Sequence, residues 1–331
     1  MTTEARVEPL HTRMLTVDVR AAEGGALALC GQVLDLRKRG LVPLPGALQL
    51  PGVIHHMTLA ARVDPAARAL TELRVEQPSV AFEPSPATRG ESCRDPAGAL
   101  QALVGVRLDG DFLPALTGCF GGPRGCTHLL TLARLAASTA LRVLALEAAL
   151  PGPPRAPGAR VLRRSLTIDG FAVPERAMEL AVQLADVHLA REAGDELFDQ
   201  LASHAEVRAH ARLDRVTTRL EALALAERRR TRASLDAPLE DRSAEVADLV
   251  GRPLVGGLGA ELVRRLGGDA AAAPRLDALL SLAPGYVQCV AALADLFLGS
   301  AAGAAAGLGA RPDSCFMWRR GGALQRARDE V

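Results

Sequence analysis

The sequence predicts an α+β protein formed by a tandem duplication of a four-stranded antiparallel sheet packed by helices. Three observations lead to this prediction. A pattern of residues recurs about 150 positions further along the chain, apolar and polar residues alternate over strand-length stretches, and a proline- and glycine-rich stretch lies near the middle. The predicted parts are a first copy over residues 1–150, a linker over 151–158, a second copy over 159–300 and an Ala/Gly-rich segment and C-terminal tail over 301–331.

The repeat is clearest near the start of each copy, where the same or similar residues follow in the same order. Arg13, Leu15, Thr16, Asp18 and Asp35 in the first copy recur as Arg164, Leu166, Thr167, Asp169 and Asp186 in the second. Further matching segments follow at nearly the same separation, up to the end of each copy. Segments in constant order indicate a duplication, because chance matches would not keep their order.

Each copy is expected to begin with strands and end with helices. In the first copy, residues 10–19, 26–36, 53–63 and 69–77 alternate in the manner of half-buried strands and are separated by turn residues. After Cys93 the pattern becomes helical, over residues 97–104, 111–117 and about 127–149. The stretch 151–158 contains four prolines and two glycines in close succession with no apolar periodicity, which predicts a linker.

Charge and composition exclude several classes of protein. Thirty-nine basic residues are balanced by 38 acidic ones, so the chain lacks the positive charge of a nucleic-acid-binding protein. The N-terminus shows no apolar signal-like stretch, which predicts a cytoplasmic protein. Residues 289–310 are interrupted by Asp295 and end in alanine and glycine, so we expect a buried helix and a linker rather than a membrane span. The six scattered cysteines predict thiols rather than disulfides.

The residues best suited to chemistry gather in the first copy. They are His55, His56, Cys93, Cys126 and His128. The second copy has Ala205 and Glu206 opposite the two histidines, and neither cysteine nor histidine opposite the others. Because the repeat keeps the pattern of strands and helices without this His/Cys set, we expect the first copy to carry a site and the second to pack against it as a structural partner.

The densest motif of the chain is Gly121-Gly-Pro-Arg-Gly-Cys-Thr-His128. Its glycines and proline predict a tight turn before a helix, so Cys126 is expected at the helix N-terminus, where free N–H groups favour a thiolate. Cysteine and histidine are the ligands that zinc binds most readily, usually four of them. The sequence therefore predicts a zinc site formed by Cys93, Cys126, His128 and one of His55 and His56, since neighbouring strand residues point to opposite faces.

Such a site would serve metal-dependent binding or catalysis on a small molecule. A second hypothesis is a metal-free enzyme in which Cys126 is the nucleophile and His128 or His55 the base. A third is a non-catalytic scaffold or interaction protein. Outside the first copy, the basic run 228–232 is expected to be a solvated loop, and His188, His204 and His210 are expected on a charged helix.

Residues Gly125-Cys-Thr-His-Leu129 resemble a motif of a bacterial family catalogued as domain-of-unknown-function family 2889. The resemblance extends to His11-Thr-Arg13, Ile54-His-His-Met-Thr-Leu59, Cys93 and Leu103-Val-Gly105. It implies that His55 is the histidine of the family pattern, while His56 stands where an acidic residue is common. No activity follows from the resemblance, which adds weight to the site residues alone.

Two weaker similarities concern the tail and the order of ligands. Asp313-Ser-Cys-Phe316 is similar to the family's Asp-x-Cys-His ending, with Phe316 in place of the histidine. Iron–sulfur scaffold proteins of the U type also have a ligand at a strand end and a cysteine at a helix start. His55, Cys93 and Cys126 follow in that order here, although the first of them is a histidine and the spacing is longer.

Overall fold

The computed structural model describes residues 7–44, 47–174, 176–192, 194–196, 198–267, 269–294 and 312–329. The strands of the first half are β1 (Glu8–Ala21), β2 (Leu27–Arg37), β3 (Val42–Leu44), β4 (Ala47–Gln49), β5 (Gly52–Asp64) and β6 (Ala69–Ser79). Those of the second half are β7 (Arg160–Ala172), β8 (Ala177–Leu189), β9 (Leu201–Asp214), β10 (Leu220–Arg230) and β11 (Glu240–Asp241).

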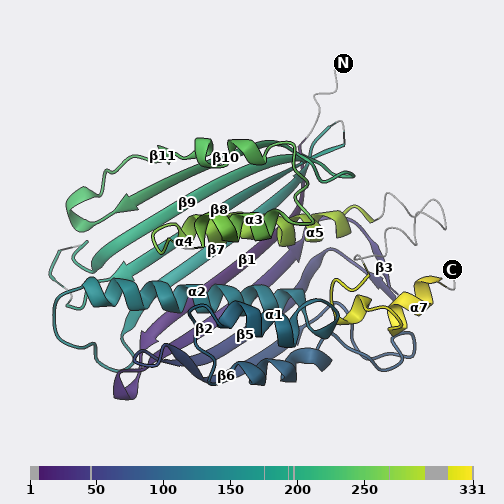
Figure 1. Ribbon diagram of the computed structural model, residues 1–331. Helices are drawn as coiled ribbons and strands as arrows, with labels where there is room; N and C mark the ends of the chain where they lie inside the picture. Colours follow the sequence, from purple (N-terminus) through teal and green to yellow (C-terminus); the bar gives the residue numbers. More distant parts are fainter. Residues whose placement is uncertain are drawn as a thin grey trace.

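All of these strands except β3 and β4 form one antiparallel sheet in the order β11-β10-β9-β8-β7-β1-β2-β5-β6 (Figure 1). The α+β class is thus confirmed, but the prediction of separate four-stranded sheets is wrong. Strand β1 pairs with β7 from Glu8 opposite Ala172 to Arg20 opposite Arg160. An unpaired strand edge leaves backbone N–H and C=O groups without partners. The pairing of β1 with β7 satisfies these groups on both strands and joins the two halves into a continuous sheet.

The helices of the first half are α1 (Phe112–Phe120) and α2 (Thr127–Ala149), with single turns of 3₁₀ helix at η1 (Glu23–Gly25) and η3 (Gly122–Arg124) and a longer one at η2 (Asp95–Leu103). The second half contains α3 (Leu258–Leu266), α4 (Ala273–Leu280), α5 (Leu282–Ala291), η4 (Arg232–Ser234), η5 (Ser243–Glu245) and η6 (Ala247–Leu249). The tail adds η8 (Phe316–Trp318) and α7 (Ala323–Asp329). The predicted helix over 97–104 is therefore 3₁₀.

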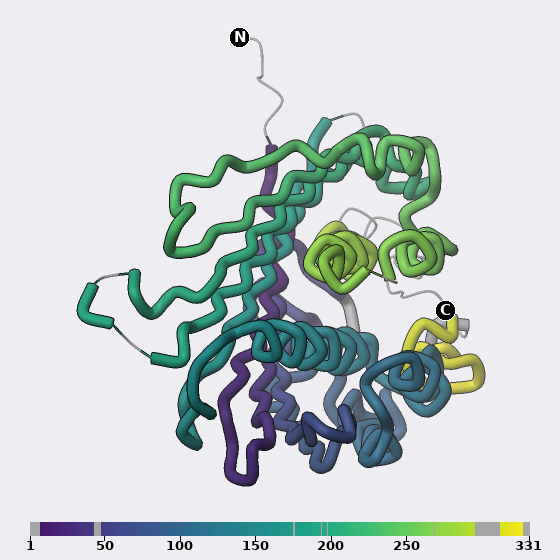
Figure 2. The backbone as a smooth tube through the Cα atoms, turned by 60° about the vertical axis from the view of Figure 1, so that its left-hand side comes forward, coloured from purple at the N-terminus to yellow at the C-terminus, as the bar shows by residue number. Residues whose placement is uncertain are grey.

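Helices α1 to α5 cover one face of the sheet, and the opposite face, here called the open face, has no α-helix among the described residues (Figure 2). Helix α2 is rich in leucine and alanine and free of glycine and proline, which favours a long helix. It packs on β1, β2 and β5. Within the described residues it alone is long and apolar enough to cross a membrane, and 56% of its most apolar 18-residue stretch is buried inside the protein.

Two other expectations for the second half are corrected. His188 lies on β8, and His204 and His210 lie on β9. Alternating burial along β8 and β9, with Leu184 and Val207 on the covered face, outweighs the helical propensity of their alanines and leucines. Residues 228–230 of the basic run belong to β10 rather than to a loop.

The predicted 151–158 linker contains no helix or strand and connects α2 to β7. Residues 301–310 of the predicted Ala/Gly-rich segment lie outside the described residues. Beyond them, Met317 and Trp318 of the tail pack on Phe82, and Phe316 donates a backbone hydrogen bond to the carbonyl of Gly125 at 2.8 Å. The end of the chain thus returns to the turn that precedes α2.

Candidate metal centre

The candidate site is centred on a buried aspartate of the first half, on a strand that lies between β1 and β5. Asp35 of β2 is fully buried on the helix-covered face of the sheet. The register places Arg13 of β1 on one side of it and His55 of β5 on the other. Arg13 donates from Nε to Oδ1 at 2.7 Å and from Nη2 to Oδ2 at 2.9 Å. Three adjacent strands therefore bring a cation, a carboxylate and an imidazole into one row.

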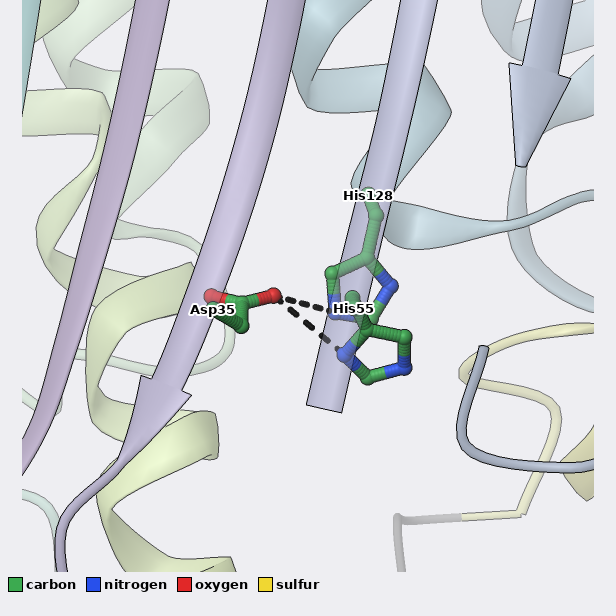
Figure 3. Close-up of side chains that lie close together, drawn as sticks. All are labelled: Asp35, His55 and His128. Carbon is green, nitrogen blue, oxygen red and sulfur yellow. Dashed lines mark ion pairs between the residues drawn. The ribbon is translucent and has the colours of Figure 1, made fainter. Parts of the chain in front are cut away.

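A second imidazole reaches the same carboxylate from α2. His128 Nε2 lies 3.1 Å from Oδ2 of Asp35, and His55 Nδ1 lies 3.3 Å from the same oxygen (Figure 3). The two imidazole rings lie against each other, with centroids 3.8 Å apart and planes tilted by 33°. Among the described residues, Asp35, His55 and His128 form the one group of ligand atoms close enough together to hold a metal ion, all within 4.8 Å of one another.

The turn before α2 fixes the position of His128. Gly122 has φ +58°, and a Cβ on Gly125 would collide with the carbonyl oxygen and ring of Phe120. Cys126 follows with extended backbone and is the N-cap of α2. The glycines of the motif are thus needed for the tight approach of this turn to α1, and the turn directs the first residues of α2 at the sheet.

The ring nitrogens of the two histidines that face Asp35 lack a complete set of hydrogen-bond partners. His55 Nδ1 is buried and, although close to Asp35, is not aligned for a hydrogen bond. His128 Nε2 faces a carboxylate oxygen of Asp35 at 3.1 Å and the amide nitrogen of Gln288 in α5 at 3.2 Å. One ring nitrogen cannot both donate to the first and accept from the second, so these nitrogens are not fully satisfied by the protein alone.

The charges at the site are suited to a cation. Burial opposes ionisation of Asp35, but the charge of Arg13 and the close approach of His128 and His55 outweigh it, so the pKa of Asp35 lies well below its ordinary value. Burial lowers the pKa of His128 to about 3. At neutral pH the site therefore offers a carboxylate and a neutral imidazole at His128, the forms in which these side chains bind metals.

The cysteines of the predicted set lie beside this group rather than in it. Cys126 Sγ is 3.5 Å from His128 Nδ1, on the other side of the ring from Asp35, and 4.0 Å from the sulfur of Met57. Burial raises the pKa of Cys126 to about 11, so the thiolate expected at the helix N-terminus does not form at neutral pH. Cys93 packs with Cys315 against the side chains of Met317 and Trp318.

The remaining predicted residue, His56, is only partly buried and follows His55 on β5, so its side chain points to the open face. Residues that sequence reasoning left out of the site are Asp35, Arg13 and His11, whose Nε2 lies 3.5 Å from Asp35 Oδ1. The signal that could have found them was the recurrence of Arg13 and Asp35 as Arg164 and Asp186. Such a charged pair is buried in both halves.

The fold and this cluster define the molecule as an α+β protein with a nine-stranded antiparallel sheet and a buried Asp/His/His group that could hold a metal ion. The model of the family described as protein of unknown function (DUF2889) matches residues 11–142, which contain the whole group. This match supports that domain family for the first half of the chain. No curated protein and no solved structure gives a significant match.

Proposed function

We propose that the first half of the chain binds a zinc ion through Asp35, His55 and His128 and uses it to bind or transform a small molecule. The observation that carries the proposal is the convergence of two imidazole nitrogens on one carboxylate oxygen, at 3.1 and 3.3 Å, in a buried site. Buried polar atoms without good partners are costly, and a shared cation would satisfy all three side chains at once.

The ligand types favour zinc. Two histidines and one carboxylate are a common set for catalytic zinc, which takes three protein ligands and leaves a further position open. A zinc ion held in this way would act as a Lewis acid toward a small molecule in the open position. Iron–sulfur clusters take thiolate ligands, so the distant similarity to U-type scaffolds is not part of the proposal.

Neighbouring residues would orient the ligands. Arg13 holds the carboxylate of Asp35 from the side away from His55, and Cys126 lies against Nδ1 of His128. Partners of this kind fix the rotamer of a ligating carboxylate and the tautomer of a ligating histidine. In this proposal Cys126 is a positioning residue, whereas Cys93 and His56 take no part.

A comparison with the second half, which has the same kind of ion pair but no histidine beside it, supports the proposal. Asp186 of β8 pairs with Arg164 as Asp35 does with Arg13, but Ala205 stands opposite it where His55 stands in the first half. Arg164 also binds Asp277 of α4 at 2.6 Å, so the charges in this half are compensated by other side chains. We take the two halves to descend from one duplicated unit, of which the first kept or acquired the metal ligands.

The two other hypotheses are less well supported. A metal-free enzyme with Cys126 as nucleophile needs a thiolate, and the raised pKa of this buried thiol disfavours it. A purely structural scaffold does not explain why two histidines with lone pairs for a metal are buried against a carboxylate. The predicted cytoplasmic location stays part of the proposal.

Zinc titration of the chelator-treated protein tests it. We expect one zinc ion per chain by isothermal titration calorimetry, with binding weakened about tenfold or more in His55→Gln and in His128→Gln. His56→Gln is the matched control, because it changes the neighbouring histidine on the other face of the same strand. Absence of stoichiometric zinc binding, or equal affinity in all three variants, would contradict the proposal.

A further inference from the structure

A second feature of the molecule lies on the open face of the second half, away from the metal centre. It is an open hollow of about 520 Å³, here called the Arg230 hollow, lined by Val187, Leu189, Phe198, Gln200, Leu201, His204, Arg230 and Leu235. Its floor is formed by β8, β9 and β10. Its walls come from Phe198 and Gln200, which precede β9, and from Leu235 in the loop after β10.

The charge of Arg230 is the first unusual property of this hollow. The neighbouring arginines all have carboxylate partners: Arg228 contacts Glu206 at 2.5 Å, Arg229 contacts Glu227 at 2.8 Å, and Arg232 contacts Asp199 at 2.8 Å. Among the described residues no carboxylate lies within ion-pair distance of Arg230. Its Nε is shielded from solvent and has no hydrogen-bond partner.

A second side chain with an unpartnered nitrogen stands beside Arg230. His204 is its direct partner across β9 and β10, and Nδ1 of His204 is likewise buried without a hydrogen bond. Two side chains from adjacent strands thus line the same hollow, and each has a buried nitrogen without a hydrogen-bond partner. The lining contains no acidic residue, and apart from these two and Gln200 it is apolar.

We propose that the Arg230 hollow binds a carboxylate that carries an apolar chain. The guanidinium of Arg230, supported by His204, would hold the carboxylate, since arginine forms strong charge-assisted hydrogen bonds with this group. The apolar chain would lie on Val187, Leu189 and Leu201 and be enclosed by Leu235 and Phe198. Phe198 is 52% exposed, and an apolar ligand would cover part of its ring.

The size of the hollow agrees with such a ligand, because pockets for small molecules usually measure about 300–1,000 Å³. The two sites lie on opposite faces and in different halves of the sheet, so this proposal is independent of the zinc site. Within the basic run 228–232, Arg230 is the arginine for which the described residues provide no carboxylate partner, and it is also the one that lines the hollow.

Sodium decanoate, below its micelle concentration, is the probe for the test, and calorimetry of the full chain is the measurement. We expect saturable binding of one decanoate, weakened about tenfold or more in Arg230→Gln, because a charged hydrogen bond is lost. Arg212→Gln is the matched control: Arg212 lies on the adjacent strand β9 and is partly exposed, but it contacts Glu179 and Glu221 outside the hollow. This variant should bind decanoate like the unmodified protein.

Sodium acetate separates the two parts of the ligand. We expect it to bind at least about tenfold more weakly than decanoate, because it lacks the chain that buries apolar surface. Equal affinity for acetate and decanoate would overturn the proposal in favour of a simple anion site. Unchanged decanoate binding in Arg230→Gln, or no binding to the unmodified protein, would overturn it as well. Circular dichroism checks that both variants are folded.

Discussion

Arg13 and Asp35 form a bidentate ion pair across β1 and β2, with N–O distances of 2.7 and 2.9 Å and almost no solvent exposure. Arg164 and Asp186 form the corresponding pair across β7 and β8, at 2.6 and 2.7 Å. A buried pair of this kind adds little net stability, but removing one partner leaves an uncompensated charge in the core. In the first half that charge would be the carboxylate of the candidate metal centre.

Replacing Arg13 by methionine should therefore lower the free energy of unfolding by about 3–5 kcal/mol. Urea denaturation of the chelator-treated protein measures this. Added zinc should restore a part of the loss, because it supplies a positive charge to Asp35 in place of the guanidinium. A stability loss that zinc does not change would argue that the ion does not bind at this carboxylate.

Asp277 should matter for stability but not for zinc. It is buried in α4 and accepts hydrogen bonds from Arg134 and Ser138 of α2 and from Arg164 of β7, at 2.6–2.7 Å. Asp277→Asn removes the charge that compensates two arginines. We expect the free energy of unfolding, measured by urea denaturation, to fall by about 3 kcal/mol. The zinc affinity of the same variant is the control and should stay within twofold of the unmodified protein.

Gly125 should be essential for the start of α2. Gly125→Ala places a Cβ against the carbonyl oxygen and ring of Phe120, so the turn must shift. We expect about 3 kcal/mol of destabilisation and weaker zinc binding, since His128 follows this turn. Gly118→Ala in α1 is the matched control, because nothing lies within 4 Å of its new Cβ. Similar melting temperatures for the two variants would contradict the prediction.

The thiols should differ widely in reactivity. Cys30 is exposed, whereas Cys126 and Cys289 are buried and burial raises their pKa values to about 11 and about 12. Because only the thiolate reacts, iodoacetamide at pH 8 should modify Cys30 at least about 100-fold faster than the other two. Mass spectrometry of the digested protein measures this, and in 6 M urea the difference should disappear. Fast modification of Cys126 in the folded protein would instead favour the nucleophile hypothesis.

Stability should fall on mild acidification, partly because of His188. Burial lowers the pKa of this histidine below 6.5, although Glu147 lies 2.7 Å from its ring. The unfolded chain then binds a proton that the folded chain does not, so stability is complete above about pH 6.5 and decreases as the pH falls below it. Unfolding free energies at pH 7 and pH 5 should differ less in His188→Gln than in the unmodified protein. An equal difference in the variant and in the unmodified protein would contradict the assignment of this pH dependence to His188.

The local structure of the first half could be predicted because each element has its own pattern. Alternation marks β1, β2, β5 and β6, and the glycine turn followed by a leucine- and alanine-rich run marks α2. The pairing of β1 with β7 has no such pattern, since it depends on which two edges meet. The sequence therefore predicted the strands of the first half but not the single sheet.

The candidate site was predicted in part for a related reason. His55 and His128 were found as rare residues present in one copy only. Asp35 was missed because a single carboxylate in a strand usually points to solvent, and only the register shows that it faces Arg13 and His55. Cys126 was expected among the ligands from its place before α2, but the direction of the helix turns the other nitrogen of His128 toward the carboxylate.

The central position of β1 also has a consequence for the order in which the sheet is completed. Strand β1 begins at residue 8, but β7 begins only at residue 160, after α2. During synthesis the first half can assemble β1, β2, β5 and β6 while the outer edge of β1 still has no partner. A chain that stopped after α2 would keep this edge open, and pairing with the β1 edge of another such chain would be the nearest substitute for β7.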